Sequence, residues 1–257
     1  MINTKNFNVY IVMYHYVRQI RKSIFPNLKG LEFSDFKKQV SFFEKNFNIL
    51  SNEDFIEIIN TKKIPKKKSV ILTFDDGYID HWKFVYPYLK KKKISGNFYP
   101  SVQLLKNNKI LDVNKIHFIL AKEENKKKIL NLIFKLIKKY MNKNQDDLDI
   151  HKINTAHRYD DKETLLIKRL LQTHLPLKIR EKIVNKIFEL IINYDEKSFS
   201  KKLYMNKGHI IEMFKNNMTI GSHGDNHFRW ENLSYKNQFS EVKKSIDYFK
   251  RSEEHTS

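Results

Sequence analysis

Residues 69–77 have the sequence SVILTFDDG, which decides the fold class of the chain. An unbroken apolar run of this length, closed by Gly77, predicts a short strand that is buried on both faces, as in a parallel sheet covered by helices. Ligands bind at the carboxyl ends of the strands in such folds. Asp75 and Asp76 therefore predict a functional site at this edge. Adjacent side chains of an extended segment diverge, and the mutual repulsion of the two carboxylates favours a bound cation.

Length and composition narrow the kinds of protein and of site that are possible. With 257 residues, of which 40% are apolar, the chain can bury a substantial core as one barrel-sized domain or one domain with an insertion. There is no Cys, which excludes disulfides, thiolate metal sites and a Cys nucleophile. Any metal ligands must therefore be His, Asp or Glu.

The formal net charge of +20 is compatible with binding to nucleic acid or an anionic membrane. Of the 49 basic residues, however, 42 are Lys and seven are Arg, and the lysines occur in every segment. Specific recognition of phosphates and bases favours Arg, so we interpret the charge as a solvated surface. The sequence contains neither a signal-peptide pattern nor an apolar run of membrane-spanning length, and we expect a soluble, cytoplasmic protein.

The order of predicted elements supports an α/β fold. Predicted strands at residues 9–14, 47–50, 69–77 and 95–99 alternate with helical segments, as in a parallel sheet or barrel. The apolar run at residues 9–14 predicts a buried strand. From about Asp112 to Leu203 the apolar periodicity is helical almost throughout, which predicts a helical insertion. A strand at residues 218–222 and a helix at 234–250 follow it. Residues 251–257 look foreign, so we expect a non-native tail on a chain that continues beyond Lys250.

Two histidines complete a candidate metal site. His223 and His227 are four residues apart and follow the strand predicted at 218–222, so both imidazoles can reach one ion. One carboxylate and two imidazoles with open positions form the ligand set of a catalytic zinc site, and the same set suits non-haem iron. The second carboxylate separates the two interpretations, because hydrolysis needs a base beside the metal-bound water and iron oxygen chemistry does not require one.

These residues resemble the motifs of a known family. The stretch Thr73–Gly77 is similar to the first motif of the polysaccharide deacetylase (NodB-homology, carbohydrate esterase) family, and His223-x-x-x-His227 resembles its second motif. Gly224 departs from the second motif, which usually has Ser or Thr at this position. The resemblance implies an irregular (β/α) barrel of the NodB-homology type, in which the large helical insertion predicted above is not part of the minimal domain. It also implies C-terminal truncation, because later family motifs would fall beyond Lys250. We divide the chain into a first barrel part at 7–100, the insertion at 101–205, a barrel continuation at 206–250 and a non-native tail at 251–257.

The resemblance also implies roles for the site residues. Asp76, His223 and His227 would bind a divalent metal ion, with zinc expected, and Asp75 would be the general base. The reaction would be hydrolysis of the N-acetyl group of an N-acetylated sugar in a glycan or glycan precursor. The enzyme would thus be a hydrolase of carbon–nitrogen bonds other than peptide bonds.

His15 has two interpretations. The segment around Tyr14-His15-Tyr16 resembles the N-terminal strand of a subgroup in which the His is proposed to act as general acid, but a His that only ends a strand fits equally well. Other polar residues are similarly ambiguous. Residues 80–82, Asp-His-Trp, could touch a sugar ring or form a solvated turn, and Asp225 is expected to brace its loop.

Two other functions stay open at this point. The chain could be a catalytically silent, glycan-binding relative, which metal content and acetate release would separate from an enzyme. It could also be a basic nucleic-acid-binding protein, which predicts strongly salt-dependent binding. The helical insertion is expected to serve as a lid or as a surface for self-association, because its apolar stripes need burial.

Overall fold

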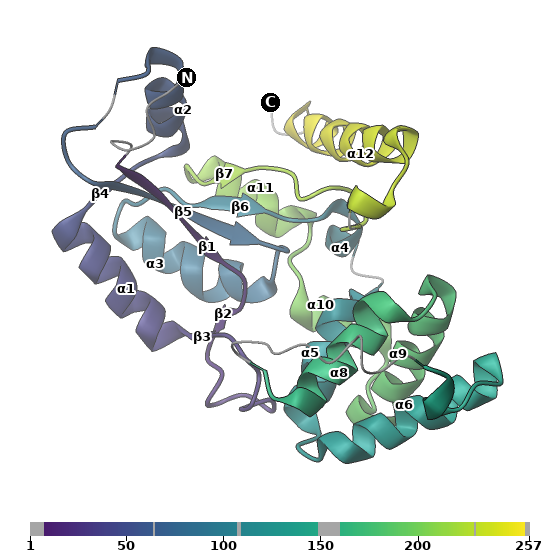
Figure 1. The fold of residues 1–257 in the computed structure, drawn as a ribbon. Helices are drawn as coiled ribbons and strands as arrows, with labels where there is room; N and C mark the ends of the chain where they lie inside the picture. Colours follow the sequence, from purple (N-terminus) through teal and green to yellow (C-terminus); the bar gives the residue numbers. More distant parts are fainter. Residues whose placement is uncertain (1–7, 64, 107–108, 149–159, 229, 255–257) are drawn as a thin grey trace. The chain divides into compact units, whose positions relative to one another are not determined.

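The structure is a computed structural model that describes residues 8–63, 65–106, 109–148, 160–228 and 230–254 (Figure 1). The chain divides into two compact units. The first comprises residues 1–19, 30–109 and 197–257, and the second comprises residues 20–29 and 110–196. All the candidate site residues named above belong to the first unit.

The first unit combines a parallel sheet with helices. Its strands are β1 (Val9–Tyr14), β2 (Val17–Arg18), β3 (Leu31–Glu32), β4 (Asn48–Ile49), β5 (Ser69–Asp75), β6 (Asn97–Tyr99) and β7 (Thr219–Ile220). Its α-helices are α1 (Phe33–Asn46), α2 (Asn52–Thr61), α3 (Tyr86–Lys91), α4 (Val102–Leu105), α10 (Glu196–Leu203), α11 (Lys207–Lys215) and α12 (Tyr235–Glu254). A π-helical turn, η2 (His81–Val85), leads into α3, and a 3₁₀ turn, η5 (Trp230–Asn232), precedes α12.

Strand β5 is the centre of the sheet. It pairs with β1 along one side, whereas β4 pairs with its first two residues and β6 with its last three. Strand β7 extends the sheet beyond β6, and every one of these pairings is parallel. All seven residues of β5 are buried, which confirms the prediction of a strand covered on both faces. The predicted α/β class is confirmed, while the series β1-β5-β6-β7 does not by itself establish a closed barrel among the described strands.

Strand β1 corrects one expectation. The sequence predicts a buried strand at Val9–Tyr14, and the strand is present, but Tyr10, Ile11 and Met13 are 48%, 62% and 61% exposed. The prediction of burial was wrong because β1 is the terminal strand of the described sheet and has a neighbouring strand on one side alone. Only its end is well covered, where Tyr14 stacks on Phe74 of β5 at 5.2 Å between ring centroids.

Aromatic side chains join the helices to the sheet. Phe74 of β5 stacks on Phe98 of β6 at 4.7 Å, and Phe36 of α1 meets Phe74 edge-on at 5.9 Å. Phe36 also contacts Tyr88 of α3, so both helices pack against the same part of the core. These buried rings hold β5 and β6 in fixed register, and the chain segments that leave the two strands start from this rigid base.

The second unit is helical. It contains α5 (Asp112–Lys122), α6 (Lys126–Met141), a 3₁₀ turn η3 (Gln145–Asp147), α8 (Lys162–Arg169), a π-helical turn η4 (Leu170–His174) and α9 (Leu177–Ile192). Its core includes Ile133 of α6 and Ile187 of α9, and Phe25 packs on Phe118 of α5 at 4.8 Å. The helical periodicity of the sequence in this region therefore corresponds to real helices. Within the described residues, every helix is too short or too polar to serve as a membrane span.

Candidate active site

The end of strand β5 forms a sharp turn. Asp75 is its last residue, and Asp76 and Gly77 follow with φ angles of 68° and 72° in the left-handed region. Asp tolerates this region better than most residues, but Gly77 is required for a second reason. A Cβ atom at this position would lie 2.6 Å from Cβ of Pro100. The turn ends the alternation of side chains between the two faces of β5. The carboxylates of Asp75 and Asp76 therefore have different surroundings.

The histidine loop starts from the neighbouring part of the sheet. Gly221 and His223 donate backbone hydrogen bonds to the carbonyls of Phe98 and Pro100, at 2.8 and 3.2 Å, and so continue the pairing of β7 with β6. Because β5, β6 and β7 are parallel, this loop leaves the sheet at the same edge as Asp76. The convergence of the two predicted motifs is therefore a consequence of strand order.

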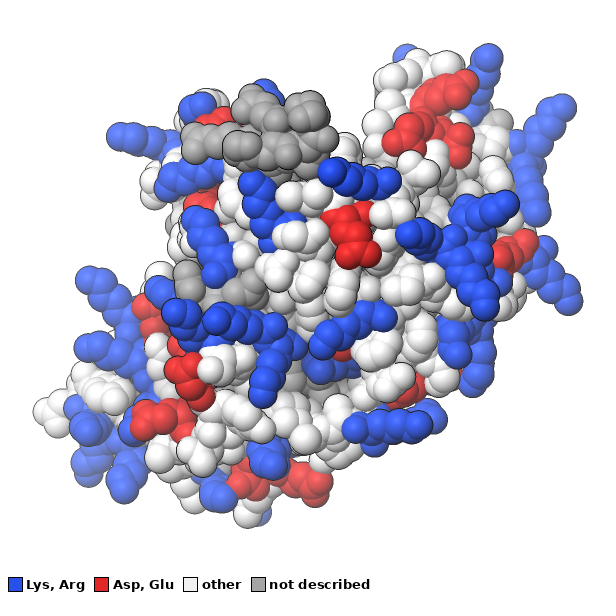
Figure 2. Space-filling view, turned by 180° about the vertical axis from the view of Figure 1, so that it is seen from behind, with Lys and Arg blue, Asp and Glu red and all other residues white. Residues whose placement is uncertain are grey.

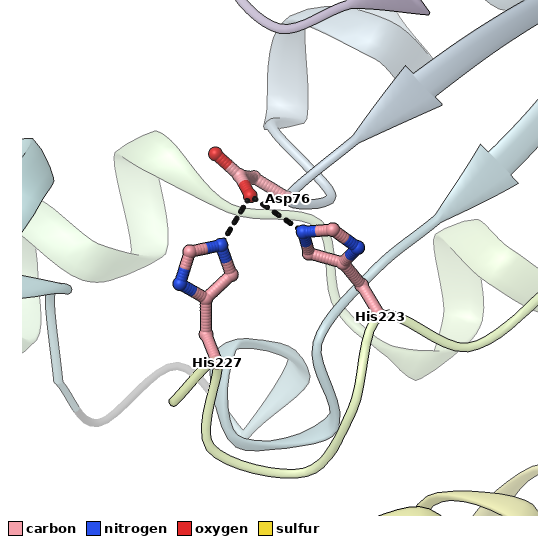
Figure 3. Close-up of side chains that lie close together, drawn as sticks. All are labelled: Asp76, His223 and His227. Carbon is pink, nitrogen blue, oxygen red and sulfur yellow. Dashed lines mark ion pairs between the residues drawn. The ribbon is translucent and has the colours of Figure 1, made fainter. Parts of the chain in front are cut away.

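Asp76, His223 and His227 come together at this edge (Figure 3). Nε2 of His227 lies 3.1 Å from Oδ1 of Asp76, and Nε2 of His223 lies 3.6 Å from the same oxygen. One ligand atom from each of the three side chains lies within 4.8 Å of the others. Among the described residues, they form the one group of His, Asp and Glu side chains with this geometry.

A buried tyrosine supports the carboxylate of Asp76. The Tyr78 hydroxyl donates a 2.6 Å hydrogen bond to Oδ2, which leaves Oδ1 to face the imidazoles. The Tyr78 ring is 1% exposed and stacks on Tyr16 at 4.3 Å and on Tyr204 at 5.9 Å. The sequence analysis missed this residue. Its place two positions after Asp76 was the available signal, but a hydroxyl partner is visible only in the folded chain.

The two carboxyl groups have pKa values that move in opposite directions. Burial raises the pKa of Asp76, but the contact with His227 and the hydrogen bond from Tyr78 prevail and hold it well below its ordinary value. Burial also has the largest effect on Asp75, and there it prevails over the positive charge of His223 and raises the pKa. Two neighbouring acids whose surroundings separate their pKa values are suited to different chemical roles.

The two imidazoles also differ. Burial lowers the pKa of His223, and the positive charge of His227 lowers it further. Burial acts on His227 in the same direction, but the contact with Asp76 prevails and raises the pKa. A metal ion binds neutral imidazole, so His227 would have to be neutral at the nitrogen that faces Asp76 in order to bind an ion.

His15 lies at the end of β1, near the same carboxylates. Its charge is among those that lower the pKa of Asp75. Its backbone is held by His81, whose Nε2 lies 2.6 Å from the His15 carbonyl oxygen. A carbonyl can only accept, so this contact assigns the proton of His81 to Nε2. His81 is fully buried, and burial lowers its pKa to about 4, which keeps the ring neutral near pH 7.

The structure resolves the ambiguous residues 80–82. Asp80 and His81 are buried, at 5% and 0% exposure, so the solvated turn and the direct sugar contact are both wrong for them. The π-helical turn η2 directs His81 inward, and Asp80 forms an ion pair with Arg18 at 3.4 Å. Trp82 stacks on His209 at 4.2 Å between ring centroids. Its indole nitrogen donates a 2.9 Å hydrogen bond to a carboxylate of α11.

Residues 62–148 match the family model of polysaccharide deacetylase. The matched segment includes β5 and the TFDDG motif at its end. The family resemblance is confirmed. The polysaccharide deacetylase match also supports the predicted enzyme class, a hydrolase acting on carbon–nitrogen bonds other than peptide bonds. It stops before the histidine loop, so the ligand roles of His223 and His227 are not part of it. No curated protein matches the chain.

Several solved structures of deacetylases are similar to the chain. The Streptococcus pyogenes deacetylase PplD in complex with acetate is 15% identical with a TM-score of 0.48, and the match covers 96% of this chain and 68% of that one. The de-N-acetylase from Aggregatibacter actinomycetemcomitans is 16% identical with a TM-score of 0.41, and the match covers 86% of this chain and 55% of that one. IcaB from Ammonifex degensii is 17% identical with a TM-score of 0.33, and the match covers 45% of this chain and 49% of that one. The chain thus spans about half to two thirds of these proteins, and TM-scores below 0.5 add nothing to the argument from the family model.

Proposed function

We propose that the chain is a metal-dependent deacetylase that hydrolyses the N-acetyl group of an N-acetylated sugar in a glycan or glycan precursor. The single observation that carries the proposal is the convergence of Asp76, His223 and His227 beside a second carboxylate, Asp75. A carboxylate and two imidazoles with open coordination positions form the donor set of catalytic zinc sites. The family match over residues 62–148 supports the reaction class.

The donor atoms fit a divalent ion. Oδ1 of Asp76 is buried and makes no well-formed hydrogen bond within the described residues, although two imidazole nitrogens face it. A buried charged oxygen without a hydrogen-bond partner is costly, and a cation between the three side chains would satisfy it. The hydrogen bond from Tyr78 to the other oxygen orients the carboxylate, as outer-shell partners of metal ligands generally do. A divalent ion there would polarise the acetamide carbonyl and acidify a bound water.

Asp75 is the proposed general base. Its raised pKa makes it a better proton acceptor than Asp76, whose lowered pKa suits a permanently charged ligand. The Asp75 carboxylate would accept the proton of the attacking water as that water adds to the acetamide carbonyl carbon. Cleavage of the carbon–nitrogen bond then releases acetate, and the departing nitrogen needs a proton to leave as an amine.

His15 is the proposed donor of that proton. The buried His81 fixes its backbone at the end of β1, so the imidazole starts from a rigid position near Asp75. An imidazolium can donate a proton in the neutral pH range. In this proposal His15 acts as general acid at the leaving nitrogen, and Asp75 acts as general base at the water.

The charge distribution on one face of the molecule bears on the nucleic-acid-binding alternative. Figure 2 shows one face of the molecule, on which Lys and Arg are spread widely and interspersed with Asp and Glu. Recognition of nucleic acid usually gathers basic side chains into a patch or stripe. A dispersed distribution agrees with a solvated basic surface.

The proposal is tested by comparing two neighbouring substitutions. Asp75→Asn should keep the metal ion and lose acetate release from N-acetylglucosamine oligosaccharides by ~10²–10⁴-fold, because an amide keeps the shape but cannot accept the proton. Asp76→Asn should lose the metal ion first. Elemental analysis and acetate release are measured on the same preparations. Equal loss of metal in both variants would refute the division of roles, and a metal-loaded wild type that releases no acetate would favour a silent glycan-binding relative.

A further inference from the structure

The loop that carries both histidines depends on its neighbours for its shape. It runs from Gly221 to His227 and has left-handed φ angles at Gly224, 81°, and at His227, 59°. A non-Gly residue in this region is strained by roughly 1–2 kcal/mol. His227, one of the two imidazoles of the proposed site, is such a residue, so contacts from outside the loop must stabilise this conformation.

A buried glutamate of α12 makes the strongest of these contacts. Oε2 of Glu241 accepts the backbone N–H of Asn226 at 2.7 Å, and Oε1 accepts its side-chain Nδ2 at 2.7 Å. Glu241 is 5% exposed. Burying a carboxylate costs several kcal/mol unless strong hydrogen bonds replace its hydration. Here both oxygens are directed at the single residue that precedes His227, which is a specific use of a buried charge.

A second contact from α12 lies one helical turn further along. Oγ of Ser222 donates a 2.7 Å hydrogen bond to Oγ of Ser245, which is 1% exposed, and Ser222 Oγ accepts the backbone N–H of Gly224 at 3.0 Å. Glu241 and Ser245 are four residues apart and therefore lie on one face of the helix. Helix α12 thus holds the loop immediately before His223 and immediately before His227.

The opposite side of the loop is held by α4. The carbonyl of Asp225 accepts from Oγ of Ser101 at 2.7 Å and from the backbone N–H of Gln103 at 3.0 Å. Nε2 of Gln103 also donates to Oδ1 of Asp225 at 3.0 Å, so Asp225 braces the loop as its position in the sequence suggested. Contacts with α4 fix the middle of the loop, whereas Glu241 fixes the end that bears His227.

We propose that Glu241 is a positioning residue that holds His223 and His227 in the geometry required to bind the metal ion. The proposal rests on the proposed function for the identity of the ligand. Within the described residues, the hydrogen bonds of the Glu241 carboxylate go to Asn226 and not to an imidazole, so Glu241 would act through the backbone and side chain of Asn226. Loss of its carboxylate is expected to lower metal affinity by roughly 10–100-fold, which is typical for outer-shell partners of metal ligands.

The test compares Glu241→Gln with Asp247→Asn. Both substitutions remove one negative charge from α12, but Asp247 is exposed and pairs with Lys243 on the helix surface. Zinc affinity is measured by competition with a chromophoric chelator. We expect 10–100-fold weaker binding for Glu241→Gln and no change for Asp247→Asn. Equal affinities in the two variants would overturn the proposal, because a general charge effect would act on both.

A second measurement is independent of the metal. In the metal-free protein, the backbone amide of Asn226 should exchange with solvent faster in Glu241→Gln than in wild type, because its acceptor is weakened. An unchanged exchange rate refutes the positioning role. If the wild type binds no zinc while exchange does accelerate, the proposed function fails and the loop contact stands. If Glu241→Gln does not fold, Asn226→Ala keeps the backbone hydrogen bond to Glu241 and removes the side-chain hydrogen bonds to Glu241 and Asp225. Wild-type zinc affinity in that variant overturns the proposal.

Discussion

Gly77→Ala is expected to destabilise the first unit strongly. Comparison with Gly224→Ala separates the contribution of backbone strain from that of a steric clash. Gly77 and Gly224 have similar left-handed φ angles, 72° and 81°. A Cβ at Gly77 would lie 2.6 Å from Cβ and 3.2 Å from Cα of Pro100, a backbone contact that cannot easily move aside. A Cβ at Gly224 would meet only Oε2 of Glu241, at 3.8 Å, which is ordinary contact. The two Ala variants therefore share the conformational strain but not the clash.

The expected losses in the free energy of unfolding follow from the conformational strain and from the clash with Pro100. An L-residue in the left-handed region costs about 1–2 kcal/mol, which should be the whole effect of Gly224→Ala on the free energy of unfolding. Overpacking a rigid site adds about 1–3 kcal/mol, so Gly77→Ala should lose about 2–5 kcal/mol in total.

Tryptophan fluorescence during urea denaturation is a suitable assay. The chain has two Trp residues, Trp82 and Trp230, and both belong to the first unit, so unfolding of the helical unit does not contribute to the signal directly. The difference between the variants should appear in the midpoint with an unchanged denaturant slope. Equal losses in the two variants would mean that Pro100 yields to the new methyl group, and the reasoning from the contact distance would be refuted.

His15→Gln should slow acetate release, leave the zinc content unchanged and remove the alkaline limb of the pH–rate profile; an unchanged profile would return His15 to a structural role. His81 has a folded pKa of about 4, below the unfolded value of 6.5, so its neutral form stabilises the protein above pH 6.5 and this stability is lost as the pH falls to 4. The unfolding free energies of wild type and His81→Gln should therefore converge by about 3 kcal/mol between pH 7 and pH 4, and a constant difference would show that His81 is accessible to protons in the folded state. If the helical unit mediates self-association, Leu190→Lys should shift the protein towards monomer in sedimentation velocity, because Leu190 of α9 and Tyr194, which follows this helix, are 54% and 44% exposed. A wild type that is monomeric at every concentration would contradict this.

The parts of the fold that the sequence predicts are those encoded locally. The apolar run of β5 predicts a strand without any knowledge of its tertiary neighbours. In a parallel sheet, the loops that follow neighbouring strands lie at the same edge. The sequence alone therefore predicts that Asp76 lies close to His223 and His227. The capping box of Ser51 and Asp54, which starts α2, is likewise encoded by residues close together in the sequence.

The features that the sequence does not predict depend on tertiary neighbours. Tyr78, His81 and Glu241 are polar residues in segments that read equally well as solvated turns or helix surface. Each is buried because a particular partner meets it: Asp76 for Tyr78, the His15 carbonyl for His81 and Asn226 for Glu241. Periodicity carries no information about such pairs, since the partners are separated by 2, 66 and 15 positions.

The close approach of the two points where the chain leaves and re-enters the first unit has a consequence for the order of folding. The backbone N–H of Ile110 donates to Oε1 of Glu196 at 2.8 Å, so the first and last residues of the inserted segment 110–196 meet. Beside them, Oγ of Ser200 donates to the carbonyl of Lys109 at 2.9 Å. Closing an unstructured loop of about 90 residues costs about 4 kcal/mol of chain entropy, and a segment that has already folded with its ends together removes most of that cost. Pairing of β7 with β6, and with it the arrival of both histidines at Asp76, then becomes a local step that follows the helical segment during synthesis.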